Sequence, residues 1–224
     1  MIDFQILHTD PAFVVVIKPP RVKSTDEPGG VPDLCRAALG GENFRTVHRL
    51  DQVVSGLMVL ARTKRAASDL SQQIRDGIFH KEYQAVLHGC PDAPAGTLRD
   101  LLWRSKPERK TYVVSEPGKD VQEAILNYEL LAQTDAFSRV RIELITGRTH
   151  QIRAQFAHAG HPLLGDGKYG KLDKRFDRNY QALYSYKLTF DFSTDAGSLA
   201  YLNGKSFQVE QVDFVEEYFP GTKI

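Results

Sequence analysis

The sequence lacks several features that mark common classes of protein. No apolar run approaches the roughly 20 residues that a membrane helix requires, and the N-terminal residues Met1 to Phe4 lack the basic-then-apolar order of a secretory signal. The only cysteines, Cys35 and Cys90, show no paired spacing of the kind found in disulfide frameworks or zinc sites. Together these absences favour a reducing, cytoplasmic compartment.

Composition places the chain among ordinary globular proteins, and its charge is distributed unevenly. Hydrophobic residues make up 42% of the 224 residues and charged residues 25%, with a formal net charge of +1. Residues 99–110 carry five basic and two acidic side chains, and residues 141–178 carry eight basic and four acidic ones. Residues 191–224 carry six acidic and two basic side chains. This distribution is compatible with one positive face for a polyanion, or with ordinary solvated surface.

Local patterns predict an α+β fold with a mostly antiparallel sheet. Short apolar or alternating runs predict strands at residues 6–7, 13–17, 57–61, 79–87, 98–103, 111–114, 123–131, 137–145, 183–192 and 207–214. Helical spacing and end signals predict helices at residues 32–39, 64–75 and 148–158. The polar stretch 21–31, rich in glycine and proline, predicts a mobile loop.

Three separated groups of polar residues could meet at one cleft. His48-Arg49-Leu50-Asp51 lies just before a Ser-Gly turn and a buried strand, Tyr83 lies on the mostly apolar face of its strand, and Arg148 begins the last predicted helix. A carboxylate, a phenol and a guanidinium together can attack, shuttle a proton and hold the carboxylate ionised. For each residue taken alone, a structural role is the more common one: Tyr83 as a core tyrosine, Arg148 as a brace for a phosphate or carboxylate, and Arg49 with Asp51 as an ion pair that braces a loop.

The same motifs resemble those of the RluA-type RNA pseudouridine synthases, over a span from about Ile6 to Phe190. His48 to Asp51 followed by Ser55-Gly56 is similar to the family's HRLD-x-x-T-S-G signature, and Lys81-Glu82-Tyr83 is similar to its Lys-x-Tyr strand. Further matches, in the same order, are Lys18-Pro19, Gly147 to Arg153, Gly160 to Asp166 and Tyr169-Gly170. Several motifs in one order make the resemblance specific.

The resemblance implies isomerisation of uridine to pseudouridine within RNA, in a catalytic domain with a central cleft. Asp51 takes the position of the catalytic aspartate, and Arg148 that of the arginine that pairs with the aspartate. Tyr83 takes the position of the tyrosine that packs on the target base and is a candidate proton acceptor. Whether Asp51 attacks the ribose, attacks the uracil or removes a sugar proton stays open. No metal or other cofactor is needed for this reaction.

The resemblance also indicates which residues contact the substrate. Arg49 takes the position of the arginine that fills the gap left by the flipped uridine, and the basic connector 104–110 is a candidate for phosphate contacts, as is the segment 168–178. The expected substrate-binding residues are His48, Arg49, Lys81, Arg109, Lys110 and Ile152. We expect residues 1–224 to form a single catalytic domain, without a separate N-terminal RNA-binding domain, that acts as a monomer on ribosomal or transfer RNA.

The chain departs from the family pattern at three places. Val54 stands where the family usually has threonine, Arg21 stands where a glycine is expected after Lys18-Pro19, and Leu183-Tyr184-Ser185 stands where the family has Leu-His-Ala. These departures indicate a divergent subgroup and bear on the choice of RNA target more than on the reaction.

Other functions remain as alternatives. A hydrolase triad of Ser55, His48 and Asp51 lacks the Gly-x-Ser-x-Gly elbow, and a retaining glycosidase needs a second carboxylate that no motif singles out. A metal site at His158 and His161 lacks a third ligand. The main alternative is a non-catalytic RNA-binding module derived from the enzyme, although binding alone needs neither the acid nor the phenol.

Overall fold

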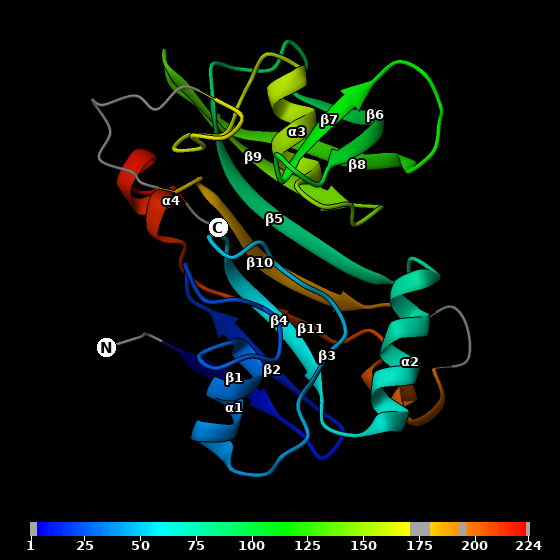
Figure 1. Cartoon of the computed structure of the whole chain (residues 1–224). Coiled ribbons are helices and arrows are strands. Elements are labelled where there is room, and N and C mark those ends of the chain that lie inside the picture. The colour runs from blue at the N-terminus through cyan, green and yellow to red at the C-terminus, as the bar shows by residue number, and fades with distance from the viewer. Residues whose placement is uncertain (1–3, 171–179, 193–195, 223–224) are drawn as a thin grey trace. The chain divides into compact units, whose positions relative to one another are not determined.

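The computed structural model describes residues 4–170, 180–192 and 196–222, and it divides into two compact units (Figure 1). Unit 1 comprises Met1–Lys81 and Ser185–Val209, and unit 2 comprises Glu82–Tyr184 and Glu210–Ile224. No helix among the described residues has the length and apolar character needed to span a bilayer. Most strand pairs are antiparallel and the helices are few, which confirms the predicted α+β fold class.

Unit 1 contains a sheet with the strand order β1-β2-β4-β10, in which β3 also pairs with β4 and β11 with β10. Its strands are β1 (Gln5–Thr9), β2 (Phe13–Lys18), β3 (Arg45–Thr46), β4 (Ser55–Ala61), β10 (Leu183–Phe190, whose first two residues belong to unit 2) and β11 (Ser206–Gln208). Its helices are α1 (Val31–Leu39), α2 (Lys64–Arg75) and the short 3-10 helix η1 (Gly197–Leu202). The antiparallel pairing of β1 with β2 confirms the predicted N-terminal hairpin.

The core of unit 1 is built on β2 and β4. Residues 13–16 and 57–61 are fully buried, and the two strands pair antiparallel with Val15 opposite Val59. A strand covered on both faces can be apolar at every position instead of alternating. The unbroken run from Leu57 to Ala61 is therefore a buried strand, as predicted.

Helix α2 shows how local signals set the bounds of an element in this chain. Thr63 caps the N-terminus, because its Oγ1 accepts a hydrogen bond from the Ala66 backbone N at 3.0 Å. Ala66 and Leu70 are buried, on a helix that packs against β3, β4 and η1. Gly77, with φ +74°, follows the last turn. The helix spans the predicted residues 64–75.

Gly56 allows β4 to lie unusually close to β10. It has φ +125°, and a Cβ atom at this position would lie 2.3 Å from the backbone oxygen of Ser185. Ser185 in turn places its Oγ 3.3 Å from the Leu57 carbonyl oxygen, as a hydrogen-bond donor. Only glycine fits here, because the obstructing atoms belong to the backbone of the neighbouring strand.

Unit 2 contains an antiparallel sheet with the order β5-β9-β8-β6-β7. Its strands are β5 (Phe79–His88, whose first three residues belong to unit 1), β6 (Ala95–Ser105), β7 (Lys110–Val114), β8 (Val121–Gln133) and β9 (Phe137–Leu144). Its helices are α3 (Gln151–His158) and α4 (Asp213–Tyr218). Both predicted strand pairs, 98–103 with 111–114 and 123–131 with 137–145, are confirmed.

Helix α3 covers one face of this sheet where β6 and β7 lie (Figure 1). Ala154 of the helix packs with Leu102 of β6 and Ala124 of β8 in one buried cluster. Phe156 is 1% exposed, and its ring meets the Tyr128 ring edge-on with the ring centroids 5.7 Å apart. The face of β6 that carries Leu102 is therefore the packed face of the sheet.

Two predicted elements differ from the structure. The strand predicted at 207–214 is instead β11, which ends at Gln208, and helix α4, which begins at Asp213. The consecutive residues Phe214 and Val215 are both buried, which suits a helix better than a strand exposed on one face. The helix predicted to begin at Arg148 begins three residues later, at Gln151.

Candidate active site

Asp51 lies half-buried on a loop of unit 1 that is fixed on both sides. The Ser24 hydroxyl donates to the Leu50 carbonyl oxygen at 2.8 Å and accepts from the Leu50 backbone N at 3.1 Å. On the other side, the Val54 backbone N donates to the Asp51 carbonyl oxygen at 3.0 Å, which closes a turn. These bonds hold the backbone of Asp51 in one conformation ahead of the buried strand β4.

Lys18, at the end of β2, places a basic group beside this loop. Its side chain is fully buried, and its Nζ donates to the carbonyl oxygens of Pro19 and Gln52, each at 2.9 Å. Burial lowers the pKa of Lys18 to about 7, against an opposing attraction from the Asp51 carboxylate. Lys18 thus joins the loop after β2 to the Asp51 loop.

Arg21 occupies the loop position where the family pattern has glycine. Its φ of +67° lies in the left-handed region that favours glycine. The Gln52 side-chain nitrogen donates to the Arg21 carbonyl oxygen at 3.1 Å, which ties this backbone to the residue after Asp51. Arg21 therefore keeps the left-handed backbone conformation that a glycine would adopt here, although arginine favours this conformation less than glycine does.

His48 has a structural contact that occupies one of its ring nitrogens. Its Nε2 accepts a hydrogen bond from the Val59 backbone N at 3.0 Å, and its ring meets the edge of the Phe79 ring. Burial, and then the nearby charge of Lys81, lower the pKa of His48 to about 3, so the imidazole is neutral at pH 7. An Nε2 that accepts from the backbone cannot take a proton from Ser55, which argues against a hydrolase triad.

Arg49 is exposed, next to a surface cavity of about 420 Å³. The cavity is lined by Thr25, Asp26, Phe44, Arg45, Thr46, Val47, His48 and Arg49. The Arg49 guanidinium is therefore accessible to a ligand. The neighbouring His48 instead connects the loop to β4 through its hydrogen bond with the Val59 backbone N.

Strand β5 carries Lys81 and Tyr83. Tyr83 pairs in register with Ile142 of β9 and is buried, with 5% of its surface exposed. Lys81 is half-buried at the end of the part of β5 that belongs to unit 1, and burial lowers its pKa. The two residues lie on the same side of the strand, as the alternation of side chains requires.

Arg148 lies on a loop of unit 2 that Gln151 organises. The Gln151 side-chain oxygen accepts from the Arg148 backbone N at 2.9 Å and from the Thr146 hydroxyl at 2.8 Å. The Arg148 side chain is exposed, and its Nε donates to the Glu123 carbonyl oxygen of β8 at 2.9 Å. His150 has φ +56°, and this left-handed residue separates Arg148 from the helix that was predicted to contain it.

Tyr169 links this loop to the rest of unit 2. Its hydroxyl lies 2.8 Å from His150 Nδ1 and accepts from the Thr111 backbone N at 2.7 Å. The Arg153 guanidinium lies 5.0 Å from the centroid of its ring, and Arg153 forms a buried ion pair with Asp166, with an Nε–Oδ2 distance of 2.6 Å. Ile152, in the first turn of α3, is buried, with 4% of its surface exposed.

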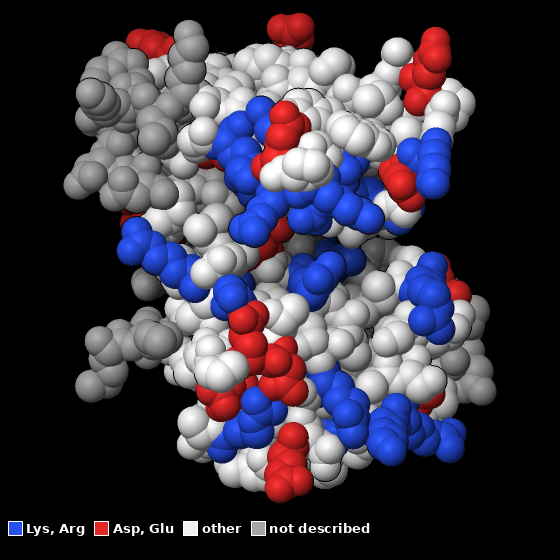
Figure 2. Space-filling model, in the orientation of Figure 1, with Lys and Arg blue, Asp and Glu red and all other residues white. Residues whose placement is uncertain are grey.

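Arg109 and Lys110 lie where the connector between β6 and β7 meets β7. Arg109 has φ +51°, and the Lys168 Nζ donates to its carbonyl oxygen at 3.0 Å. The Lys110 Nζ lies 5.1 Å from the centroid of the Tyr169 ring. Lys and Arg side chains gather over the part of unit 2 that contains β6, β7 and α3 (Figure 2). Of the predicted phosphate-contact segment 168–178, residues 171–178 lie outside the described residues.

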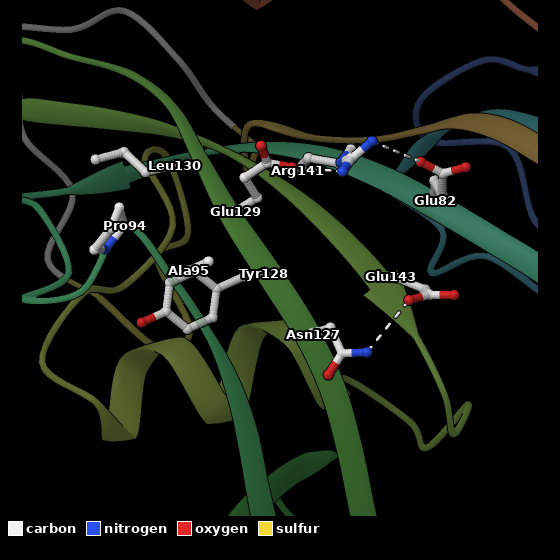
Figure 3. Close-up of a pocket in the computed structure, with 9 residues that line it drawn as sticks. All are labelled: Glu82, Pro94, Ala95, Asn127, Tyr128, Glu129, Leu130, Arg141 and Glu143. Carbon is white, nitrogen blue, oxygen red and sulfur yellow. Dashed lines mark hydrogen bonds and ion pairs between the residues drawn. The ribbon is translucent and has the colours of Figure 1, made fainter.

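A second cavity of unit 2, of about 600 Å³, contains none of the predicted site residues (Figure 3). Its charged lining consists of three glutamates and Arg141, which pairs with Glu82 and Glu129. Negative charge of this kind repels phosphate, so this cavity is a poor site for an RNA backbone.

Two residues with clear roles around these loops were missed from the sequence. Ser24 lies in the stretch predicted to be mobile, yet it is 5% exposed and holds Leu50. Tyr169 belongs to the Tyr169-Gly170 motif, but the motif alone indicates no role for its side chain. The partners of both residues are distant in the chain, so no local pattern could reveal them.

A protein-family model described as RNA pseudouridylate synthase matches residues 12–158, which include the Asp51 loop, β5 and the Arg148 loop. Among curated proteins, the chain is 37% identical over 145 residues to the uncharacterized RNA pseudouridine synthase YlyB of Bacillus subtilis (strain 168), covering 65% of this chain and 46% of that protein. It is 39% identical over 124 residues to the ribosomal large subunit pseudouridine synthase D of Haemophilus influenzae (strain ATCC 51907 / DSM 11121 / KW20 / Rd), covering 55% and 37%.

Solved structures show the same likeness. The structure of human RNA pseudouridylate synthase domain containing 4 matches with a TM-score of 0.69 at 25% identity, covering 82% of each chain. That of human RNA pseudouridylate synthase domain containing 1 matches in fold with a TM-score of 0.73 at 23% identity, covering 99% of this chain and 96% of the other. The chain spans between about two fifths and two thirds of the length of most of the curated relatives it matches.

Proposed function

The chain belongs to the RNA pseudouridylate synthase family, and from this membership we propose that it converts uridine to pseudouridine within RNA. The observation that carries the proposal is the Asp51 loop, whose backbone is fixed by Ser24 and whose carboxylate lies in the field of the buried Lys18. A reactive carboxylate needs this kind of preorganised support.

The proposed reaction breaks the N1–C1′ bond of uridine and forms a C5–C1′ bond, while the proton on C5 is lost and N1 gains one. Substrate and product have the same atoms and oxidation state, so the reaction consumes no oxidant, reductant or cofactor. The uracil must stay enclosed between the two steps, since a detached ring would otherwise be lost to solvent. A target uridine inside folded RNA must also be flipped out, which costs a few kcal/mol of stacking.

We propose that Asp51, Tyr83 and Arg148 act on the same uridine. Asp51 supplies the carboxylate of the reaction, Tyr83 packs on the base, and Arg148 provides a positive charge for the carboxylate. Because Arg148 donates its Nε to a backbone carbonyl, its remaining guanidinium nitrogens stay available for that pairing.

Substrate contacts divide into direct and supporting ones in this proposal. Arg49 is exposed and is suited to enter the gap left by the flipped base, and Arg109 and Lys110 are suited to bind phosphates. Ile152 is buried, and the half-buried His48 has its Nε2 bound to the Val59 backbone N, so we propose that both contribute to substrate binding by fixing the loops that carry Arg49 and Arg148. Lys81 contributes a basic group beside Tyr83.

We further propose that residues 1–224 work as one catalytic domain, as a monomer in the cytoplasm, on ribosomal or transfer RNA. Curated relatives that include ribosomal large subunit pseudouridine synthases support the ribosomal target. The lack of paired cysteines supports a reducing compartment.

The test is pseudouridine mapping of total RNA from cells with and without the gene, complemented with wild type, Asp51→Asn or Asp135→Asn. Asp51→Asn keeps the shape of the side chain and removes its charge, and Asp135→Asn makes the same change at an exposed residue. We expect the sites that vanish without the gene to return with wild type and with Asp135→Asn, but not with Asp51→Asn. The rate of pseudouridine formation by Asp51→Asn should fall by roughly a hundredfold or more.

The contrary result would be that no site depends on the gene and that the purified protein leaves unmodified ribosomal and transfer RNA unchanged. The RNA-binding module would then replace the enzyme as the conclusion.

A further inference from the structure

Trp103 is the single tryptophan of the chain, and it lies in strand β6 of unit 2. Side chains alternate along β6, and its neighbour Leu102 is buried against α3, so Trp103 projects from the opposite face of the sheet. The side chain is 39% exposed. A large aromatic ring left in water loses the stabilisation that burial would give, which indicates a role other than packing.

The ring of Trp103 is held in a defined orientation by its partner on β7. Trp103 and Tyr112 are directly opposite in the strand register, and their rings stack with centroids 6.3 Å apart and an angle of 28° between the planes. The Tyr112 hydroxyl donates to Glu108 at 2.8 Å, which fixes the second ring. The two rings therefore form a preorganised aromatic surface on the β6–β7 hairpin.

The hairpin that carries this aromatic pair is rich in basic residues. The Lys110 Nζ lies 5.3 Å from the centroid of the Tyr112 ring. Lys106 and Arg109 lie in the connector of the same hairpin, and Arg104 lies in β6 just before it. Within the described part of the chain no acidic side chain forms an ion pair with any of the three. The acidic residue of the connector, Glu108, is engaged by Tyr112.

We propose that the Trp103–Tyr112 pair is a stacking platform for an unpaired base of the RNA substrate, with the neighbouring cations on the adjoining phosphates. An aromatic ring beside basic side chains is the arrangement with which proteins bind single-stranded nucleic acid without reading its sequence. The inference rests on the proposed function, which identifies the partner as RNA. It adds an RNA contact at Trp103 and Tyr112, which have no role in the proposed reaction.

The single tryptophan makes the contact directly measurable without any variant at the platform. The protein is the full-length Asp51→Asn chain, which keeps the RNA unmodified during the titration, and the probes are oligouridylate and a blunt-ended RNA duplex. A base stacked on the indole quenches its fluorescence. We expect saturable quenching with oligouridylate and little with the duplex, whose bases are already stacked on one another.

Substitutions then separate stacking from charge. We expect Trp103→Ala to weaken binding of oligouridylate roughly five- to 150-fold without changing the salt dependence, and Trp103→Phe to restore most of the affinity. Tyr201→Ala is the matched control, since Tyr201 is 47% exposed and has the Lys205 Nζ 5.5 Å from its ring centroid, but lies in the acidic C-terminal part of the chain. It should leave the affinity unchanged.

The outcomes distinguish this inference from the proposed function. Binding of oligouridylate without any change in Trp103 emission, or equal affinity in Trp103→Ala, overturns the platform even if the chain makes pseudouridine. Quenching in a wild-type chain that makes no pseudouridine leaves the platform standing and removes the enzymatic function. Absence of RNA binding overturns both.

Discussion

Ser24 and Leu50 exchange two hydrogen bonds across 26 residues of chain, one from the serine hydroxyl to the Leu50 carbonyl oxygen and one from the Leu50 backbone N to the hydroxyl oxygen. One side chain thus satisfies both backbone groups of the residue that precedes Asp51. The candidate catalytic loop depends on a serine that takes no part in the proposed chemistry.

Replacing Ser24 by alanine should therefore affect both stability and activity. The substitution leaves both backbone groups of a buried residue without this partner, which we expect to lower the free energy of unfolding by about 1–3 kcal/mol. We also expect a lower kcat, because the Asp51 loop loses its fixed conformation. Urea denaturation and single-turnover kinetics measure the two effects. Ser115→Ala, at an exposed serine, is the control, and equal stability of the two variants would contradict the role given to Ser24.

His48 should make the stability of the protein sensitive to acid. Its folded-state pKa of about 3 lies below the ordinary value of 6.5, so between these pH values the unfolded chain binds a proton that the folded chain does not. Stability contributed by the neutral ring is fully present above pH 6.5 and falls with decreasing pH, by up to about 1.4 kcal/mol per pH unit. Replacing His48 by glutamine removes this pH-dependent contribution to the free energy of unfolding.

The measurement is the free energy of unfolding of wild type and His48→Gln from pH 7.5 to pH 4.5. We expect the difference between the two proteins to shrink or reverse as the pH falls. Parallel curves for the two proteins would show that His48 titrates alike in the folded and unfolded chains.

Arg21→Gly should stabilise the protein. The left-handed backbone at φ +67° costs an ordinary residue about 1–2 kcal/mol, and glycine avoids this cost while adding some entropy to the unfolded chain. We expect a net gain of about 0.5–1 kcal/mol, measured by chemical denaturation. Arg21→Ala is the control, since it removes the same side chain but keeps the unfavourable backbone. A gain in both variants would assign the effect to the side chain instead.

Asp166→Asn should destabilise unit 2 by about 3–5 kcal/mol, because it leaves the buried Arg153 guanidinium without its counter-charge. Thermal denaturation measures the loss. The double variant Arg153→Met with Asp166→Leu removes both charges and should recover part of the stability. If the double variant is less stable than Asp166→Asn, the loss of stability comes from lost packing and not from the unpaired charge.

Much of the fold could be predicted where local signals agree with tertiary packing. The bounds of α2 follow from Thr63 and Gly77, and the burial of β4 follows from its unbroken apolar run. The region after β11 could not be assigned, since apolar and polar residues alternate within 207–210 and again within 211–214, a pattern that also suits a strand. Phe207 is half-buried and its ring contacts those of Phe13 and Phe190, which are distant in sequence, whereas Phe214 is buried on α4.

The candidate site shows the same limit. Motifs single out Asp51, Tyr83 and Arg148, and their proposed roles come from resemblance to a family. The left-handed conformation of His150 could not be predicted, because its ring contacts Tyr169, which lies 19 residues further on and also binds β7. A helix start that depends on such a distant contact has no signal in the adjacent residues.

Gly56 has a consequence for how this chain can vary. The atoms that exclude a side chain at position 56 belong to the backbone of Ser185, which every amino acid shares. No second substitution at position 185 can therefore make room for Gly56→Ala. A genetic selection for suppressors of that variant should return true revertants, or stabilising changes elsewhere in the chain, and never an allele-specific partner in β10.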